Sequence, residues 1–211
     1  MKADDLEAMH AVETNHWWFV GKRMLFERLL FDRLRIRNPQ ILDVGCGTGG
    51  SAWTFATYGH VYGCDRSLVA LRLAQRSGLR DLVAADAEVL PFDSERFDIV
   101  LAFDIVEHVD DDRAMLAELG RVVRPGGAIA IHVPAWPALW SGHDEVLGHR
   151  RRYTRATLRE AITAAGLRIE YLGWASTTIL PAAAAARVLR PLLPSRGDRA
   201  DLYPLPRPLN R

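Results

Sequence analysis

The chain has 211 residues, of which 49% are hydrophobic and 25% are charged, and its formal net charge is +1. This length and composition fit a globular protein with one substantial domain and exclude a disordered chain. A net charge near zero gives no global field for nucleic acid, so we expect no nucleic-acid partner. Residues 1–13 lack the apolar core of a signal peptide and the two cysteines form no Cys-x-x-Cys pair, so we expect a cytoplasmic protein.

Residues 1–38 differ from the rest of the chain, and we expect them to form an N-terminal helical cap. The run His16-Trp17-Trp18-Phe19 precedes an amphipathic helix predicted from Gly21 to Leu34, whose apolar side chains would cover a sheet edge. Two adjacent tryptophans point in different directions on any regular element, so one of them can line a pocket.

Alternating strand and helix signals over residues 39–174 predict a parallel sheet with helices on both faces, a Rossmann-like α/β fold. Short apolar runs, typical of strands buried on both faces, predict strands at 41–44, 61–64, 82–85, 99–103 and 128–133, and a sixth at 167–174. Helices are predicted at 51–57, 68–76 and 112–123, and between Thr154 as a cap and Gly166 as a stop.

The most informative stretch is Ile41-Leu42-Asp43-Val44-Gly45-Cys46-Gly47-Thr48-Gly49-Gly50, a strand followed by a glycine loop. Glycine lets the backbone turn sharply and a ligand come close, and the helix that follows leaves free N–H groups. The glycine spacing matches the dinucleotide fingerprint, but the Asp43 carboxylate would repel a pyrophosphate. It would attract the sulfonium and the ammonium of S-adenosylmethionine.

This loop resembles the first motif of the class I S-adenosylmethionine-dependent methyltransferases, of the small-molecule type that acts in ubiquinone and menaquinone biosynthesis. Phe97–Phe103 resembles the fourth strand of that family, and Arg124-Pro125-Gly126-Gly127 resembles the turn before its fifth. The resemblance covers about residues 40–133 and implies the Rossmann-like fold and S-adenosylmethionine as the cofactor. The seventh, antiparallel strand of the family is not found in this sequence.

Further cofactor contacts are predicted at successive strand ends. Asp65 ends the second strand, where its carboxylate can accept both ribose hydroxyl protons. Asp86-Ala87-Glu88 follows the third strand and can meet the adenine amino group. The predicted cofactor residues are Asp43, Gly45, Cys46, Gly47, Gly49, Asp65, Arg66, Asp86, Ala87, Glu88 and Phe103.

The loop after the fourth strand carries the predicted chemistry. Methyl transfer requires an aligned acceptor that loses its proton, and His108 is the candidate general base because histidine titrates near neutral pH. The run Asp104-Ile105-Val106-Glu107-His108 resembles the carboxylate-x-x-Glu-His segment of ubiquinone-type O-methyltransferases. That resemblance implies a divalent metal held by Asp104, Glu107 and His108. A histidine that only packs near the cofactor is the alternative.

A polar cluster at residues 143–153 follows the fifth strand, where this fold places substrate loops. With the aromatic residues around the site, it gives the predicted acceptor contacts Trp18, Trp136, Trp140, His143, His149, Arg152 and Tyr153. Such a cluster could hold an anionic or hydroxylated acceptor. The alternative is a solvated charge run with one buried tyrosine.

Residues 175–211 form a predicted C-terminal extension rich in alanine, proline and arginine. Its part at 175–193 is expected to be helical and to pack on the domain itself, on a second copy of the chain or on a membrane surface, but it is too interrupted to span a bilayer. The predicted activity is methyl transfer from S-adenosylmethionine to a small molecule, with oxygen favoured as the acceptor atom. A nitrogen or carbon acceptor, a non-catalytic S-adenosylmethionine-binding module and an NAD-linked enzyme are the alternatives.

Overall fold

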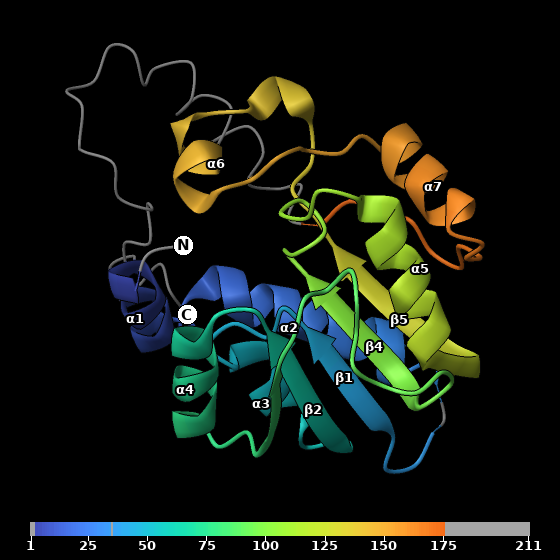
Figure 1. Ribbon diagram of the computed structural model, residues 1–211, viewed down its shortest axis with the longest axis horizontal. Helices are drawn as coiled ribbons and strands as arrows, with labels where there is room; N and C mark the ends of the chain where they lie inside the picture. The colour runs from blue at the N-terminus through green and yellow to red at the C-terminus, as the bar shows by residue number, and fades with distance from the viewer. Residues whose placement is uncertain (1–2, 35, 176–211) are drawn as a thin grey trace.

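A five-stranded parallel sheet forms the centre of the protein (Figure 1). The computed structural model describes residues 3–34 and 36–175. The strands are β1 (Gln40–Val44), β2 (His60–Asp65), β3 (Asp81–Ala84), β4 (Phe97–Phe103) and β5 (Val123–His132). Their order is β3-β2-β1-β4-β5, and each neighbouring pair is parallel. The predicted Rossmann-like α/β fold and its first five strands are confirmed.

Helices lie on both faces of this sheet (Figure 1). They are α1 (Ala3–Val12), α2 (Trp17–Phe31), α3 (Gly50–Phe55), α4 (Leu68–Arg76), α5 (Asp112–Val122), α6 (Gly142–Leu147) and α7 (Arg155–Ala164), with a 3₁₀ turn η1 at Pro137–Leu139. Two of them, α1 and α6, lie beyond the ends of the strands. Successive residues of a strand point to opposite faces, so each strand contributes side chains to the hydrophobic cores on both faces of the sheet. Ile41 packs with α2 and α3, whereas its neighbour Leu42 packs with α5 and α7.

Helix starts follow the capping residues of the sequence. Asp111 caps α5, because its Oδ1 accepts hydrogen bonds from the N–H groups of Arg113 and Ala114, each 3.0 Å long. Thr154 caps α7 as predicted. By contrast, α2 begins at Trp17 rather than at Gly21, because His16 is extended and its Nδ1 accepts the N–H of Trp18.

The predicted sixth strand at 167–174 is wrong: these residues form no ladder with β5. Leu167, Ile169 and Leu172 instead pack against the core on the α5 and α7 side, and Arg155 Nη2 donates to the carbonyl of Leu172 at 3.1 Å. Side-chain packing therefore holds the segment in place without pairing to a strand. Within the described ranges, the structure contains no helix with the length and apolar character needed to cross a membrane. The expectation for residues 176–193 lies outside the described residues.

Candidate active site

The carboxyl ends of the strands open into a large cavity. The chain reverses its strand order between β1 and β4, and open α/β sheets bind ligands at this switch point. The cavity has a volume of about 1620 Å³ and is lined by the glycine loop, by the ends of β4 and β5, and by α1 and α2. A smaller pocket of about 190 Å³ adjoins the ends of β2 and β3.

The glycine loop has a conformation that only glycine adopts freely. Gly45, Gly47 and Gly49 have φ values of +70°, +53° and +92°, and a Cβ on Gly45 would lie 2.8 Å from the side chain of Ile105. Asp65 ties the loop to the end of β2, because its Oδ2 accepts the N–H of Gly47 at 3.0 Å. Each carboxylate oxygen retains further acceptor capacity.

Asp43 carries an unsatisfied carboxylate beside this loop. The residue is 2% exposed, it lines the cavity, and its Oδ2 has no hydrogen-bond partner. Burial, aided by the charges of Asp65 and Glu13 and opposed by Lys22, raises the pKa of Asp43 to about 7. A buried carboxylate without a partner is unfavourable unless a positive group comes near it. A carboxylate at this position therefore fits a cationic ligand such as S-adenosylmethionine.

The predicted adenine residues Asp86, Ala87 and Glu88 line the smaller pocket, together with Asp65 and Arg66. The side chain of Glu88 is already committed, because its Oε1 accepts the N–H of Asp111 at 2.7 Å. The predicted cofactor residues Cys46 and Phe103 line the large cavity. Burial raises the pKa of the Cys46 thiol, which is therefore neutral.

Helix α1, within the segment predicted as a helical cap, forms a roof over the glycine loop, a position that the sequence did not predict. Met9 lies 3.6 Å from the position that a Cβ on Gly47 would occupy, and a Cβ on Gly50 would lie 2.5 Å from the Glu13 carboxylate. Leu6 and Met9 pack on α4. The three-residue spacing of these two apolar side chains was the available signal for an amphipathic helix.

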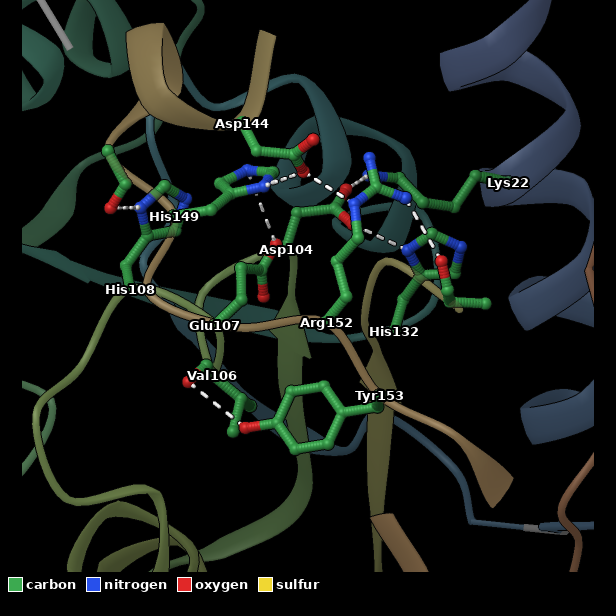
Figure 2. A network of polar contacts seen from close by, with 12 residues as sticks. Lys22, Asp104, Val106, Glu107, His108, His132, Asp144, His149, Arg152 and Tyr153 are labelled. Carbon is green, nitrogen blue, oxygen red and sulfur yellow. Dashed lines mark hydrogen bonds and ion pairs between the residues drawn. The ribbon is translucent and has the colours of Figure 1, made fainter. Parts of the chain in front are cut away.

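A second arrangement that the sequence analysis missed joins the ends of β4 and β5 to α2 (Figure 2). His132 Nδ1 lies 2.6 Å from Asp104 Oδ1, and Lys22 Nζ donates to Asp104 Oδ2. Burial favours the neutral acid, but Lys22 and His132 outweigh it and hold the pKa of Asp104 well below its usual range. Asp104 is thus an ionised carboxylate with both oxygens engaged. Lys22 is one of two lysines in the chain, and this rarity was the available signal for a specific role.

The metal-ligand set that the resemblance implies is not assembled. Asp104 is bound by Lys22 and His132, whereas Glu107 and His108 meet His149 instead. The ligand atoms of these last three residues lie within 4.8 Å of one another, the one such group of histidine, cysteine and acidic residues among those described. Figure 2 shows the His149 ring between Asp144 and Glu107.

His108, the predicted base, lines both pockets. Its Nδ1 lies 3.3 Å from the carbonyl oxygen of Gly148, and its ring meets that of His149 edge to face at a centroid distance of 4.8 Å. Burial and the neighbouring His149 lower the pKa of His108 to about 4. His108 is therefore neutral near pH 7, as the prediction requires, but it is a weak proton acceptor.

Six of the seven predicted acceptor residues line the large cavity, and Trp140 does not. Trp140 is 39% exposed because its Nε1 reaches outward to Glu145, 3.4 Å away. Tyr153 is 4% exposed, and its hydroxyl donates to Asp112 Oδ2 at 2.8 Å. The cluster is thus mainly an internal network rather than a solvated charge run.

The arginines of this cluster are neutralised within the protein. Arg150 pairs with Asp110, Arg151 with Asp112 and Arg152 with Asp144. Arg152 Nη1 also donates to the carbonyl of Ala135, which joins the loop after β5 to the segment before α7. These pairs leave little uncompensated positive charge for an anionic acceptor.

Comparison with known proteins gives a consistent result. Residues 42–131 match the methyltransferase domain family. The malonyl acyl-carrier-protein O-methyltransferase of Pseudescherichia vulneris is 36% identical over 145 residues, which cover 64% of this chain and 58% of that protein. The demethylmenaquinone methyltransferase of Streptomyces avermitilis is 34% identical over 140 residues, covering 64% of this chain and 61% of that protein. The chain therefore spans less than two thirds of either relative.

A solved structure supports the fold assignment. The Haemonchus contortus phosphoethanolamine N-methyltransferase 2, in complex with S-adenosylmethionine, superposes with a TM-score of 0.71 at 18% identity. The match covers 90% of this chain and 47% of that chain. At this identity the likeness concerns the fold, so the acceptor must be argued from the site itself.

Proposed function

We propose that this protein is an S-adenosylmethionine-dependent methyltransferase that methylates an oxygen of a small-molecule acceptor, because residues 42–131 match the methyltransferase domain family. Bound S-adenosylmethionine supplies an electrophilic methyl group. Asp43 would attract its cationic end, the glycine loop would receive its amino-acid part, and Asp65 would accept its ribose hydroxyls. The remaining task of the protein is to align the acceptor and remove its proton.

The pair formed by His132 and Asp104 is the observation that carries the oxygen assignment. An ionised carboxylate can only accept a hydrogen bond, so Nδ1 of His132 carries the hydrogen at the 2.6 Å contact, and in the neutral ring Nε2 has the lone pair. Nε2 can then take the proton of an acceptor hydroxyl, while Asp104 stabilises the imidazolium that forms. Lys22 holds the other oxygen of Asp104 and so fixes the orientation of the pair.

The contacts favour His132 over His108 as this proton acceptor. A base with a pKa of about 4 takes a proton poorly near neutral pH, and the partner of His108 is a neutral carbonyl rather than a carboxylate. His132 also ends a strand at the cavity, whereas His108 lies in the loop beyond β4. The side chain of Trp18 meets the ring of His132 at 6.1 Å and can hold a planar acceptor nearby.

An acceptor screen tests this proposal. The full chain is incubated with S-adenosylmethionine carrying a labelled methyl group and with a panel of phenols, carboxylic acids, amines and carbon nucleophiles. We expect label in an O-methyl product, identified by NMR. His132→Gln should lower kcat by roughly 10²-fold or more with unchanged cofactor affinity. The control is His60→Gln, whose side chain is 49% exposed at the start of β2 and pairs with Asp81.

Two outcomes would overturn the proposal. Label found only in N-methyl or C-methyl products would replace oxygen as the acceptor atom. Full activity in His132→Gln together with loss of activity in His108→Gln would return the base role to His108.

A further inference from the structure

Glu107 is a buried acidic residue that has no role in the proposed methyl transfer. The residue lies in the loop after β4, it is 1% exposed, and neither of its carboxylate oxygens has a hydrogen-bond partner. An unpartnered carboxyl group in the interior is costly, and such an arrangement persists only where something else compensates for it. His149 Nε2 lies 3.9 Å from Glu107 Oε1, and His108 is the third member of the group.

We propose that Glu107, His108 and His149 bind one divalent transition-metal ion, with Zn²⁺ as the best-fitting example. Two imidazoles and one carboxylate are the donor set that Zn²⁺ and similar ions of intermediate softness prefer. Bonds of about 2.1 Å in a tetrahedral arrangement place two ligand atoms roughly 3.4 Å apart. The 3.9 Å between His149 and Glu107 thus needs only a small side-chain movement to close around an ion.

The hydrogen bonds behind the two histidines favour the same conclusion. His149 Nδ1 lies 2.9 Å from Asp144 Oδ1, and the same oxygen is paired with the Arg152 guanidinium. Asp144 is therefore ionised and accepts the Nδ1 hydrogen. His108 Nδ1 likewise faces the carbonyl of Gly148 at 3.3 Å. Both rings thus keep a bare Nε2, the arrangement that carboxylates and carbonyls impose on metal-binding histidines.

Asp144 is itself held rigidly. It is fully buried, its Oδ2 accepts the N–H of Ser141 at 2.8 Å, and Arg152 Nε donates to its Oδ1 at 2.6 Å. Because these contacts fix Asp144, its hydrogen bond holds the His149 ring in one orientation in the metal-free protein. The set differs from the one that the resemblance implies, because Asp104 is engaged by Lys22 and His132 and His149 takes its place. Three protein ligands leave one coordination position open toward the cavity, where an oxygen of the acceptor could bind.

Direct metal binding tests the inference independently of methyl transfer. The full chain is stripped with a chelator and titrated with Co²⁺, whose visible absorption reports four-coordinate binding, and then with Zn²⁺ in competition by calorimetry. We expect one equivalent to bind and Zn²⁺ to raise Tm. Glu107→Gln, nearly identical in shape, and His149→Ala should each weaken binding by at least 100-fold, and Asp144→Asn by about 10–100-fold.

Two further variants separate the alternatives. Asp104→Asn should retain the ion, whereas loss of binding in this variant with retention in His149→Ala would restore the ligand set implied by the resemblance. His60→Ala, remote from the site, should bind like the parent chain. Absence of stoichiometric binding in the parent chain, or equal binding in Glu107→Gln and His149→Ala, would overturn the proposal. A failed acceptor screen would leave all of these readouts intact.

Discussion

At the scale of single residues, the site works through carboxylates placed in different surroundings. Asp43 is buried with no hydrogen-bond partner for its Oδ2, and burial raises its pKa to about 7, whereas the partly exposed Asp104 contacts Lys22 and His132, which lower its pKa. The carboxylate of Asp65 accepts hydrogen bonds from the N–H groups of Gly47 and Ser67. The same functional group therefore contacts an imidazole in one place and shapes a loop in another, and under the proposed function it would attract a cation in a third.

Asp43 predicts a measurable pH dependence. Its pKa in the folded chain lies above the unfolded value of about 3.9, so its contribution to stability is fully present at low pH and is lost as the pH rises to about 7. Only the charged form attracts a sulfonium. The affinity for S-adenosylmethionine, measured by calorimetry, should therefore rise from pH 5.5 to about 7.5 and then level off.

Asp43→Asn is the matched variant for this prediction. It should bind S-adenosylmethionine at least tenfold more weakly, with little pH dependence. At pH 8 its free energy of unfolding should exceed that of the parent chain by about 1 kcal/mol or more, equivalent to a Tm increase of about 2–4 °C or more. Parent-like affinity in Asp43→Asn would remove the carboxylate from the cofactor site.

At the scale of elements, the site depends on two helices that precede the first strand in the chain. Helix α2 supplies Lys22 and Trp18, and α1 lies over the glycine loop (Figure 1). Arg23 of α2 joins the two, because its Nη1 donates to the carbonyl of Glu13 at 2.7 Å. The core clusters on the two faces of the sheet contain no residue of α1. Detachment of α1 would therefore leave both of these core clusters intact.

Leu6→Asp should detach this roof. Leu6 is 6% exposed and packs on Ala70 and Leu73 of α4, so a charge there opposes docking. We expect the Kd for S-adenosylhomocysteine to rise about tenfold, faster hydrogen exchange in α1, and little change in Tm. Glu7→Asp, on the exposed side of the same helix, is the control. If exchange shows α1 released while Kd stays constant, the roof does not contribute to binding.

At the scale of the whole molecule, the sequence predicts what depends on local patterns. The glycine loop, the five strands and the cap Thr154 follow from spacing and side-chain chemistry, and the structure confirms them. The contacts of Asp104 with Lys22 and His132 could not be predicted in this way, because they join residues 82 and 28 positions apart. The false strand at 167–174 has the same origin, since apolar alternation does not reveal whether a neighbouring strand edge is used.

The central claim is that the ends of β1, β2 and β3 form one S-adenosylmethionine site. Calorimetry of the full chain with S-adenosylhomocysteine, followed by NADH, tests it most directly. We predict one site for S-adenosylhomocysteine, weakened at least tenfold in Asp65→Ala and unchanged in the control Asp81→Ala, whose half-exposed carboxylate begins β3. Tight binding of NADH without any response to S-adenosylhomocysteine would contradict the account.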